Sequence, residues 1–293
     1  MSKKFSFSKK YKIYIRPYYG YGDWLSINGM VRFLTTKYNK VNLVVDSGDI
    51  NFVKNLYKDD LSIDVMYYCD ISESEFFSND YLNLQVWNQN KENQNNFFNR
   101  FNRLGDFLKF NTPNIKDECY KRIEFPHNFR EECKDVLENN ASAFYVAAGI
   151  PKNCRLDNFY YERDHKSEDE FFEKLNLPKD YVVICDYGLN LINRDYIKHK
   201  DSYLININNI SEKYFDIIKV IENAKEVHLI ENSVALLVYH LQYKNLMKSI
   251  PINMHTYARK ENVRTCTSKQ NSNVYLDMFM FPSLDNWNFV YST

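Results

Sequence analysis

The chain has 293 residues, with 38 Lys and Arg against 38 Asp and Glu, so its formal net charge is zero. This balance argues against a constitutive nucleic-acid binder, which needs a cationic excess. No apolar run reaches the roughly 18 residues that a membrane-spanning helix needs. The length suits one large domain or two of about 150 residues each.

The six cysteines include no CxxC pair. Such spacing predicts reduced thiols rather than a disulfide framework or a zinc site. Residues 1–15 are basic, but they lack the long apolar core and small-residue cleavage site of a secretory signal. We therefore expect a cytoplasmic protein without a transmembrane segment.

The first half alternates between strand and helix patterns. In chain order, the predicted elements are a strand at 11–16, a turn at 17–23, a helix at 24–38, a strand at 41–45, a short helix through Val53 and Leu56, and a strand at 64–67. The helix is predicted from apolar residues at helical spacing, and the strand at 41–45 from a β-branched run. This alternation is typical of a parallel sheet with right-handed crossovers.

The middle of the chain has weaker patterns. Residues 88–103 form a polar Asn- and Gln-rich tract that we expect at the surface, whereas 128–140 is predicted as a helix and 141–149 as a buried helix end. An extended stretch is predicted at 156–161. We place a domain boundary there, which gives domains at 1–160 and 161–293.

The second half shows the same alternation of strand and helix patterns. Its predicted elements are a helix at 171–175 opened by a Ser167/Glu170 capping box, strands at 181–185 and 203–207, a helix at 211–223, a strand at 226–230, a helix at 233–242 and a strand at 250–253. Two such halves predict an α/β protein made of two Rossmann-like, doubly wound domains that face a cleft. Ligands of such sheets bind at the carboxyl ends of the strands.

The first candidate site follows the first strand. Gly20 and Gly22 would let the backbone approach a ligand closely, and the helix after them offers free N–H groups to an anion. Asp23 would lie at or near the start of this helix. The alternative is purely structural, because Asp is a favoured N-cap residue and Gly-x-Gly is a common turn.

The second candidate site follows the strand at 226–230. Glu231, Asn232 and Ser233 open the next helix, where a hydroxyl and backbone N–H groups could hold a phosphate. Ordinary N-capping by Asn232 or Ser233 is the alternative.

Two further candidates follow other strands of the second half. Asp186 follows the strand at 181–185, and Arg194 beyond it could bind a diphosphate in bidentate fashion, or else be a solvated loop residue. His255 and Arg259 follow the strand at 250–253 and could point at the cleft, although a hydrogen-bonded structural histidine is the alternative for His255.

Other well-known catalytic and binding motifs are absent from the sequence. There is no GxxxxGK[ST], HExxH, GxSxG or full GxGxxG pattern, and the remaining histidines lack metal-ligand spacing. No DxD pair is present, so we expect neither metal dependence nor a cofactor.

Taken together, these stretches resemble GT-B-type glycosyltransferase-like proteins of bacterial surface-glycan clusters and large viruses, distantly similar to heptosyltransferases. Residues 19–32 (YGYGDWLSINGMVR) resemble that family's G-x-G-D-x-L-x-x-N-G-x-x-R stretch. Residues 221–233 (IENAKEVHLIENS) resemble its I-E-x-A-x-x-I-H-x-x-D-S-S segment, although Glu231 and Asn232 stand where Asp-Ser is more usual. The 255–259 stretch (HTYAR) and the 282–287 region also look like that family.

The resemblance implies a metal-independent transfer of a sugar from a nucleotide-sugar donor to a glycan or other hydroxyl acceptor. Asp23 would be the general base. The donor would be bound mainly by Ser233, Asn232 and Arg194, with Arg259 in support. The wider donor-binding set also includes Gly20, Gly22, Asp186, Glu231 and His255.

Two other function classes remain open. The chain could be a non-catalytic glycan- or nucleotide-binding module on a GT-B scaffold, which the altered Glu231-Asn232 pair favours. It could also be a Rossmann-type enzyme that uses NAD. The missing GxGxxG argues against that reading, although Asp46 does follow the second strand.

Overall fold

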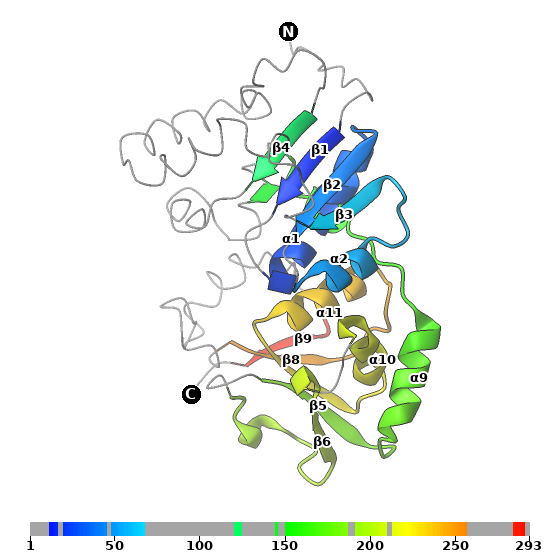
Figure 1. The fold of residues 1–293 in the computed structure, drawn as a ribbon. Helices are drawn as coiled ribbons and strands as arrows, with labels where there is room; N and C mark the ends of the chain where they lie inside the picture. The colour runs from blue at the N-terminus through cyan, green and yellow to red at the C-terminus, as the bar shows by residue number, and fades with distance from the viewer. Residues whose placement is uncertain are drawn as a thin grey trace. The chain divides into compact units, whose positions relative to one another are not determined.

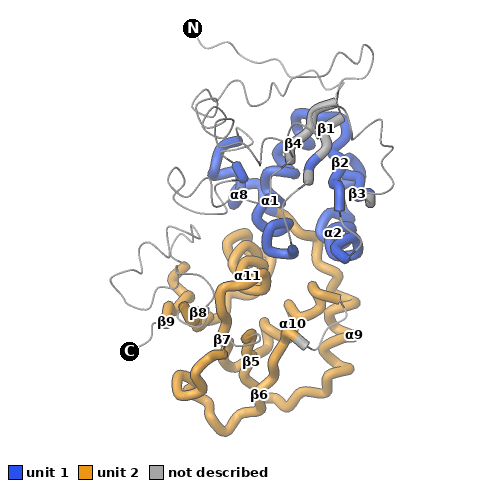
Figure 2. Tube along the Cα trace, turned by 60° about the vertical axis from the view of Figure 1, so that its left-hand side comes forward, with its two compact units in different colours: residues 1–159 blue, residues 160–293 orange. Residues whose placement is uncertain are grey.

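A computed structural model describes residues 12–16, 20–45, 48–67, 120–124, 144–145, 150–186, 191–209, 213–256 and 284–290. The chain divides into two compact units, Met1–Phe159 and Tyr160–Thr293 (Figure 2). Each unit contains a sheet in which all of the described strand pairs are parallel, with helices joining strands, so the fold is α/β and compatible with a Rossmann-like arrangement.

The sheet of the first unit has the strand order β3-β2-β1-β4 (Figure 1). Its strands are β1 (Lys12–Arg16), β2 (Lys40–Val45), β3 (Ile63–Tyr67) and β4 (Tyr120–Glu124). The β-branched run of β2 is buried almost throughout, as expected for a parallel strand covered on both faces. The first three strands follow the sequence prediction, whereas β4 was not predicted.

The long helix of the first unit, α1 (Gly20–Thr35), buries the apolar residues from which it was predicted, including Ile27, Met30 and Leu34. It begins earlier than predicted, because Gly20 and Gly22 belong to its first turn and not to a preceding turn. Gly20 has a φ of +72°, a left-handed conformation that glycine adopts without strain.

In the described part of this unit, two shorter helices accompany α1: α2 (Ile50–Leu56) and α8 (Cys154–Asp157). Helix α8 corrects the extended conformation predicted for 156–161, since Leu156 and Asp157 are helical. A Cβ on Gly29 of α1 would lie 2.1 Å from the Cys154 carbonyl oxygen, so the two helices touch backbone to backbone. The buried Tyr145 hydroxyl also bonds to the backbone of α1: it donates to the Ser26 carbonyl and accepts from the Met30 N–H.

The sheet of the second unit has the order β6-β5-β7-β8-β9. Its strands are β5 (Tyr181–Cys185), β6 (Tyr203–Asn206), β7 (Glu226–Ile230), β8 (Ile252–His255) and β9 (Trp287–Val290). Strands β5, β6 and β7 lie where they were predicted. The strand predicted at 250–253 is instead β8, so His255 is inside a strand and not after it, and β9 was not predicted.

The α-helices pack on one face of this sheet, and the segment after β5, which contains a 3-10 turn at Arg194–Tyr196, packs on the other. The helices are α9 (His165–Leu175), α10 (Ile217–Glu222) and α11 (Ser233–Tyr243). The Tyr181 hydroxyl donates to the Val220 carbonyl of α10, which places this helix on the helical face. On the opposite face, Val182, Ile184 and Ile230 form a buried cluster with Ile192 and Ile197 from the segment after β5.

Helix α9 starts earlier than the predicted capping box implied. Its N-cap is Asp164, whose side chain accepts a hydrogen bond from the Ser167 backbone N–H. Ser167 is therefore inside the helix and does not open it. Asn176 ends the helix with a φ of 45°, the left-handed C-terminal conformation that asparagine tolerates.

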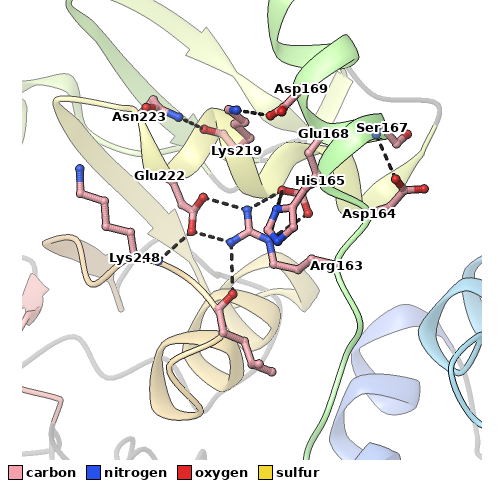
Figure 3. Close-up of polar contacts among 11 residues, drawn as sticks. Arg163, Asp164, His165, Ser167, Glu168, Asp169, Lys219, Glu222, Asn223 and Lys248 are labelled. Atoms are coloured by element: carbon pink, nitrogen blue, oxygen red, sulfur yellow. Dashed lines mark hydrogen bonds and ion pairs between the residues drawn. The ribbon is translucent and has the colours of Figure 1, made fainter.

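A buried ion-pair network anchors the start of the second unit (Figure 3). Arg163 donates to both Glu168 of α9 and Glu222 of α10, and its Nη1 also reaches the Leu246 carbonyl at 3.1 Å. The Lys248 backbone N–H donates to the same Glu222 carboxylate. One guanidinium thus joins α9, α10 and the segment after α11 by charge-assisted bonds.

Several predictions fall on residues that the structure does not describe: the loop at 88–103, the helix at 128–140, most of 141–149, and Arg259. Within the described residues, no helix is both long and apolar enough to span a membrane.

Candidate functional site

The strand order of the second unit directs attention to one place at the edge of its sheet. From β5 the chain goes to β6 on one side, whereas β7 lies on the other side of β5. Ligands of open parallel sheets bind outside the carboxyl ends of the strands at such a switch point. Asp186 directly follows β5 and Asn232 follows β7 by two residues, so both lie at this position.

Asp186 organises the switch point. It is buried, and its Oδ1 accepts from Asn206 Nδ2 at 2.6 Å while its Oδ2 accepts from the Ile192 N–H at 3.2 Å. The Arg194 guanidinium lies 3.0 Å from Oδ2, and the Asn208 side chain donates to the Asp186 carbonyl. A single carboxylate therefore joins the end of β5, the end of β6 and the segment after β5.

Asn232 links helix α11 to the same place. Its Oδ1 caps the helix by accepting from the Ala235 N–H at 3.0 Å, and its Nδ2 lies 3.1 Å from the Cys185 sulfur. Burial raises the pKa of Cys185 to about 12, so this thiol is neutral. Ser233, the first residue of α11, is half-buried beside Asn232. The positive end of the helix dipole thus lies at the switch point.

Arg194 supplies a basic group at this edge. Its side chain is 48% exposed although it pairs with the buried Asp186. Asp186 neutralises part of the guanidinium charge and holds its position. Arg194 and the start of α11 are both attached to the end of β5, Arg194 through Asp186 and Asn232 through Cys185. Their combination suits an anion, for which helix N-termini and arginine are the usual ligands in proteins.

A second polar cluster lies on the sheet face that is covered by the segment carrying Arg194. We call it the histidine row; its members are Glu226 and His228 of β7 and His255 of β8. Glu226 Oε1 lies 2.9 Å from His228 Nε2, and His228 Nδ1 lies 2.7 Å from His255 Nε2. Both histidines are completely buried. The Tyr196 ring meets the His255 ring edge-on, with centroids 5.7 Å apart.

The surroundings keep this row in a defined charge state. Burial lowers the pKa of His228, and burial together with His228 and Arg194 lowers the pKa of His255 to about 3, so both rings are neutral near pH 7. Burial opposes ionisation of Glu226. The Lys198 and His199 N–H groups and the His228 ring nevertheless bring the pKa of Glu226 below its usual value.

The candidate residues of the first unit lie after β1, beside the switch between β1 and β4. Asp23 is 4% exposed in the first turn of α1, Gly20 is exposed, and the Gly22 carbonyl accepts from the Ser26 hydroxyl at 2.8 Å. The neighbouring Trp24 indole donates to Asp49 at 3.2 Å. Asp23 thus belongs to the first unit, whereas Arg194, Asn232 and Ser233 belong to the second.

Of the predicted set, the structure pairs Arg194 with Asp186 and places Asn232 against Cys185, the residue before Asp186; Ser233 and the half-buried Glu231 flank Asn232 in sequence. His255 lies inside the sheet and is covered by Tyr196. Asn206, Asn208, Glu226 and His228 were not predicted as site residues. Two polar residues in the otherwise apolar β7 were an available signal, since buried polar groups need partners.

Among the residues that the structure describes, no group of three or more His, Cys, Asp or Glu side chains is placed to hold a metal ion. Comparison of the chain with family models, curated proteins and solved structures found no match in any of the three.

Proposed function

We propose that the chain is a metal-independent glycosyltransferase that moves a sugar from a nucleotide-sugar donor to a hydroxyl acceptor. The two-domain GT-B arrangement and the glycan acceptor belong to this proposal. The observation that carries it is the switch point of the second unit, where the half-exposed Arg194 and the Asn232-capped start of α11 are both attached to the carboxyl end of β5.

The chemistry of sugar transfer suits this arrangement. When the bond to the sugar breaks, negative charge develops on the departing diphosphate, and preorganised positive dipoles and cations stabilise it. In our proposal, Arg194 and the N–H groups at the start of α11 bind the diphosphate, and the Ser233 hydroxyl donates to it. Asp23 accepts the proton of the attacking hydroxyl.

Nucleotide binding is the first test. A thermal-shift panel of nucleoside diphosphates and nucleotide sugars should reveal a ligand, because saturation at 100 times Kd adds about 2.7 kcal/mol of stability. Arg194→Ala should weaken binding of the ligand found by roughly 10- to 100-fold, the value of one hydrogen bond to a charged group. Lys200→Ala, an exposed cation of the same segment, is the matched control. If no nucleotide stabilises the protein, the proposal is wrong.

Turnover tests the role of Asp23. Asp23→Asn preserves the shape of this buried side chain, so donor binding should stay nearly unchanged. The transfer rate should fall by about 10²- to 10⁴-fold, the usual contribution of a general base. Full activity of this variant with its acceptor would reduce Asp23 to a structural residue of α1.

One observation favours the second candidate function, a non-catalytic nucleotide- or glycan-binding module. Asp186 already neutralises part of the Arg194 charge, which leaves less charge to stabilise a leaving diphosphate. Such a module would bind nucleotide in the thermal-shift panel but neither hydrolyse nor transfer any donor sugar.

A further inference from the structure

A cavity of about 590 Å³ lies at the amino edge of the second unit's sheet. Three of its lining residues, Asp180, Ser202 and Lys225, directly precede β5, β6 and β7. Asp180 and Asp186 stand at opposite ends of β5, roughly 20 Å apart along the strand, so the cavity is separate from the switch point. We call it the lysine cavity; its lining includes Asp180, Lys198, Lys200, Asp201, Tyr203 and Lys225.

The backbone around the lysine cavity is held in place without a ligand. On one side, the Lys198 and His199 N–H groups each donate to the buried Glu226 carboxylate at 3.2 Å. On another side, the Lys225 N–H donates to the Tyr181 carbonyl at 2.9 Å. Because these segments are already ordered, a ligand that binds between them does not have to order the backbone, which lowers the entropic cost of binding.

The charges around the cavity are unevenly paired. Lys225 lies 3.2 Å from Asp180, whereas Lys200 approaches Asp195 only to 3.8 Å. No ion pair within the described part of the chain involves Lys198. The whole chain has no net charge, so this excess of cations is local. A cavity lined by such an excess attracts a ligand of negative charge.

The other lining groups favour a sugar over a bare ion. Asp180 and Asp201 repel a simple phosphate or sulfate, but their oxygens accept hydrogen bonds from sugar hydroxyls, as does the Ser202 hydroxyl. Tyr203, the first residue of β6 at the outer side of the described sheet (Figure 1), is 55% exposed, so its ring is available to stack on the apolar C–H face of a sugar. The cavity volume lies within the range of about 300–1,000 Å³ that small-molecule sites occupy.

We propose that the lysine cavity is a binding site for an anionic carbohydrate, a sugar that carries a carboxylate, sulfate or phosphate group. The lysines bind the anionic group, the aspartates and Ser202 bind sugar hydroxyls, and Tyr203 stacks on the sugar ring. This site goes beyond the proposed function and does not rest on it, because none of these residues belongs to the switch point.

Ligand-observed nuclear magnetic resonance titration of the full chain tests the site with three anionic sugars: trigalacturonate, lactose 3′-sulfate and glucose 6-phosphate. The controls are the methyl ester of trigalacturonate, lactose and glucose, and the bare anions acetate, sulfate and phosphate. At least one anionic sugar should bind about tenfold more tightly than its neutral counterpart and its bare anion, and added salt should weaken this binding. Binding of none of the three, or equal binding of the bare anion, would overturn the proposal.

Two variants with opposite effects locate the site. Lys200→Ala should weaken binding of the anionic sugar by about fivefold, the upper value of one exposed charge pair, and leave nucleotide binding unchanged. Arg194→Ala should leave sugar binding unchanged. Sugar binding that is weakened by Arg194→Ala but not by Lys200→Ala belongs to the switch point and contradicts the lysine cavity. If no nucleotide binds, the proposed function fails, and the sugar titration still decides the cavity.

The Tyr203 ring has its own matched pair of variants. Tyr203→Leu removes the aromatic face from an exposed position and should weaken sugar binding by about threefold to tenfold, the usual value of an aromatic contact. Tyr203→Phe keeps the ring and should bind like the wild type. Circular dichroism of both variants checks that the fold is retained. A folded Tyr203→Leu protein that binds the sugar as tightly as the wild type would refute the stacking role and with it the choice of a sugar as ligand.

Discussion

The two units build the carboxyl edge of a parallel sheet in different ways. In the first unit, the helix after β1 is held by close backbone packing, with Gly29 against α8 and the Tyr145 hydroxyl bonded to α1. In the second unit, the segment after β5 is held by carboxylates, Asp186 and Glu226. In the second unit, the position of the segment after β5 therefore depends on two charged side chains. The same unit contains the switch point with the half-exposed Arg194.

The strand orders explain part of this difference. The first unit has the 3-2-1-4 order of dinucleotide-binding folds, and the second has the 2-1-3-4-5 order of flavodoxin-like folds when its strands are numbered from β5. In the second order, the residues after the first and third strands, Asp186 and Asn232, become neighbours at the switch point.

The largest expected effect lies in the Arg163 network. Arg163→Met removes the partner of Glu168, whose side chain is only 1% exposed, and leaves its charge buried. We expect the second unit to lose about 3–5 kcal/mol of unfolding free energy, measured by urea denaturation.

The control for Arg163→Met is Lys166→Ala, because Lys166 and Glu170 form an exposed pair within α9, the helix that carries Glu168. Surface pairs contribute about 0–1 kcal/mol. Equal effects of the two substitutions would contradict the view that charge networks hold the second unit.

Backbone packing in the first unit comes next. Gly29→Ala would place a Cβ 2.1 Å from the Cys154 carbonyl oxygen and 2.8 Å from that of Arg155. These are backbone atoms, so α1 and α8 must separate, at a cost of about 1–3 kcal/mol. Gly48→Ala, where a Cβ meets no atom within 4 Å, should leave thermal unfolding nearly unchanged. A Gly29→Ala protein as stable as the wild type would show that α8 moves freely.

The pH dependence of stability should separate the units. The pKa values of His228 and His255 are lowered in the folded chain, so below about pH 6.5 the unfolded state binds more protons. Stability of the second unit is then complete above pH 6.5 and falls with acid by up to about 1.4 kcal/mol per pH unit for each proton. Denaturation between pH 8 and 4, followed by peptide-resolved exchange, measures this. A first unit that loses stability in parallel would argue against assigning the effect to the histidine row.

The smallest effect concerns the cap of α11. Asn232→Ala removes the bond to the Ala235 N–H and should cost about 1 kcal/mol. Asn232→Asp keeps a capping oxygen and should retain most of the stability, while its negative charge should weaken binding of any phosphate. The two variants, compared in thermal unfolding with and without nucleotide, separate the structural role from the binding role.

The strands and main helices could be predicted because local pattern controls them. The β-branched runs of β2 and β5 and the helical spacing in α1 leave few alternatives once burial is required. Strands β4 and β9 escaped prediction. Both lie at an edge of the described sheets, and three of the five residues of β4 are charged, so it has no apolar run that marks a strand.

Positions of candidate residues at strand ends were also readable from the chain, since a polar residue after a buried strand must lie at the sheet edge. Their partners were not. The pairing of Arg194 with Asp186, the burial of His255 under Tyr196 and the contact of Gly29 with α8 join residues on separate elements. Local periodicity carries no information about strand order or register, and these decide which side chains meet. The sequence by itself therefore determined the elements and the edges they end on, and the tertiary structure alone decided which charges are paired, buried or exposed there.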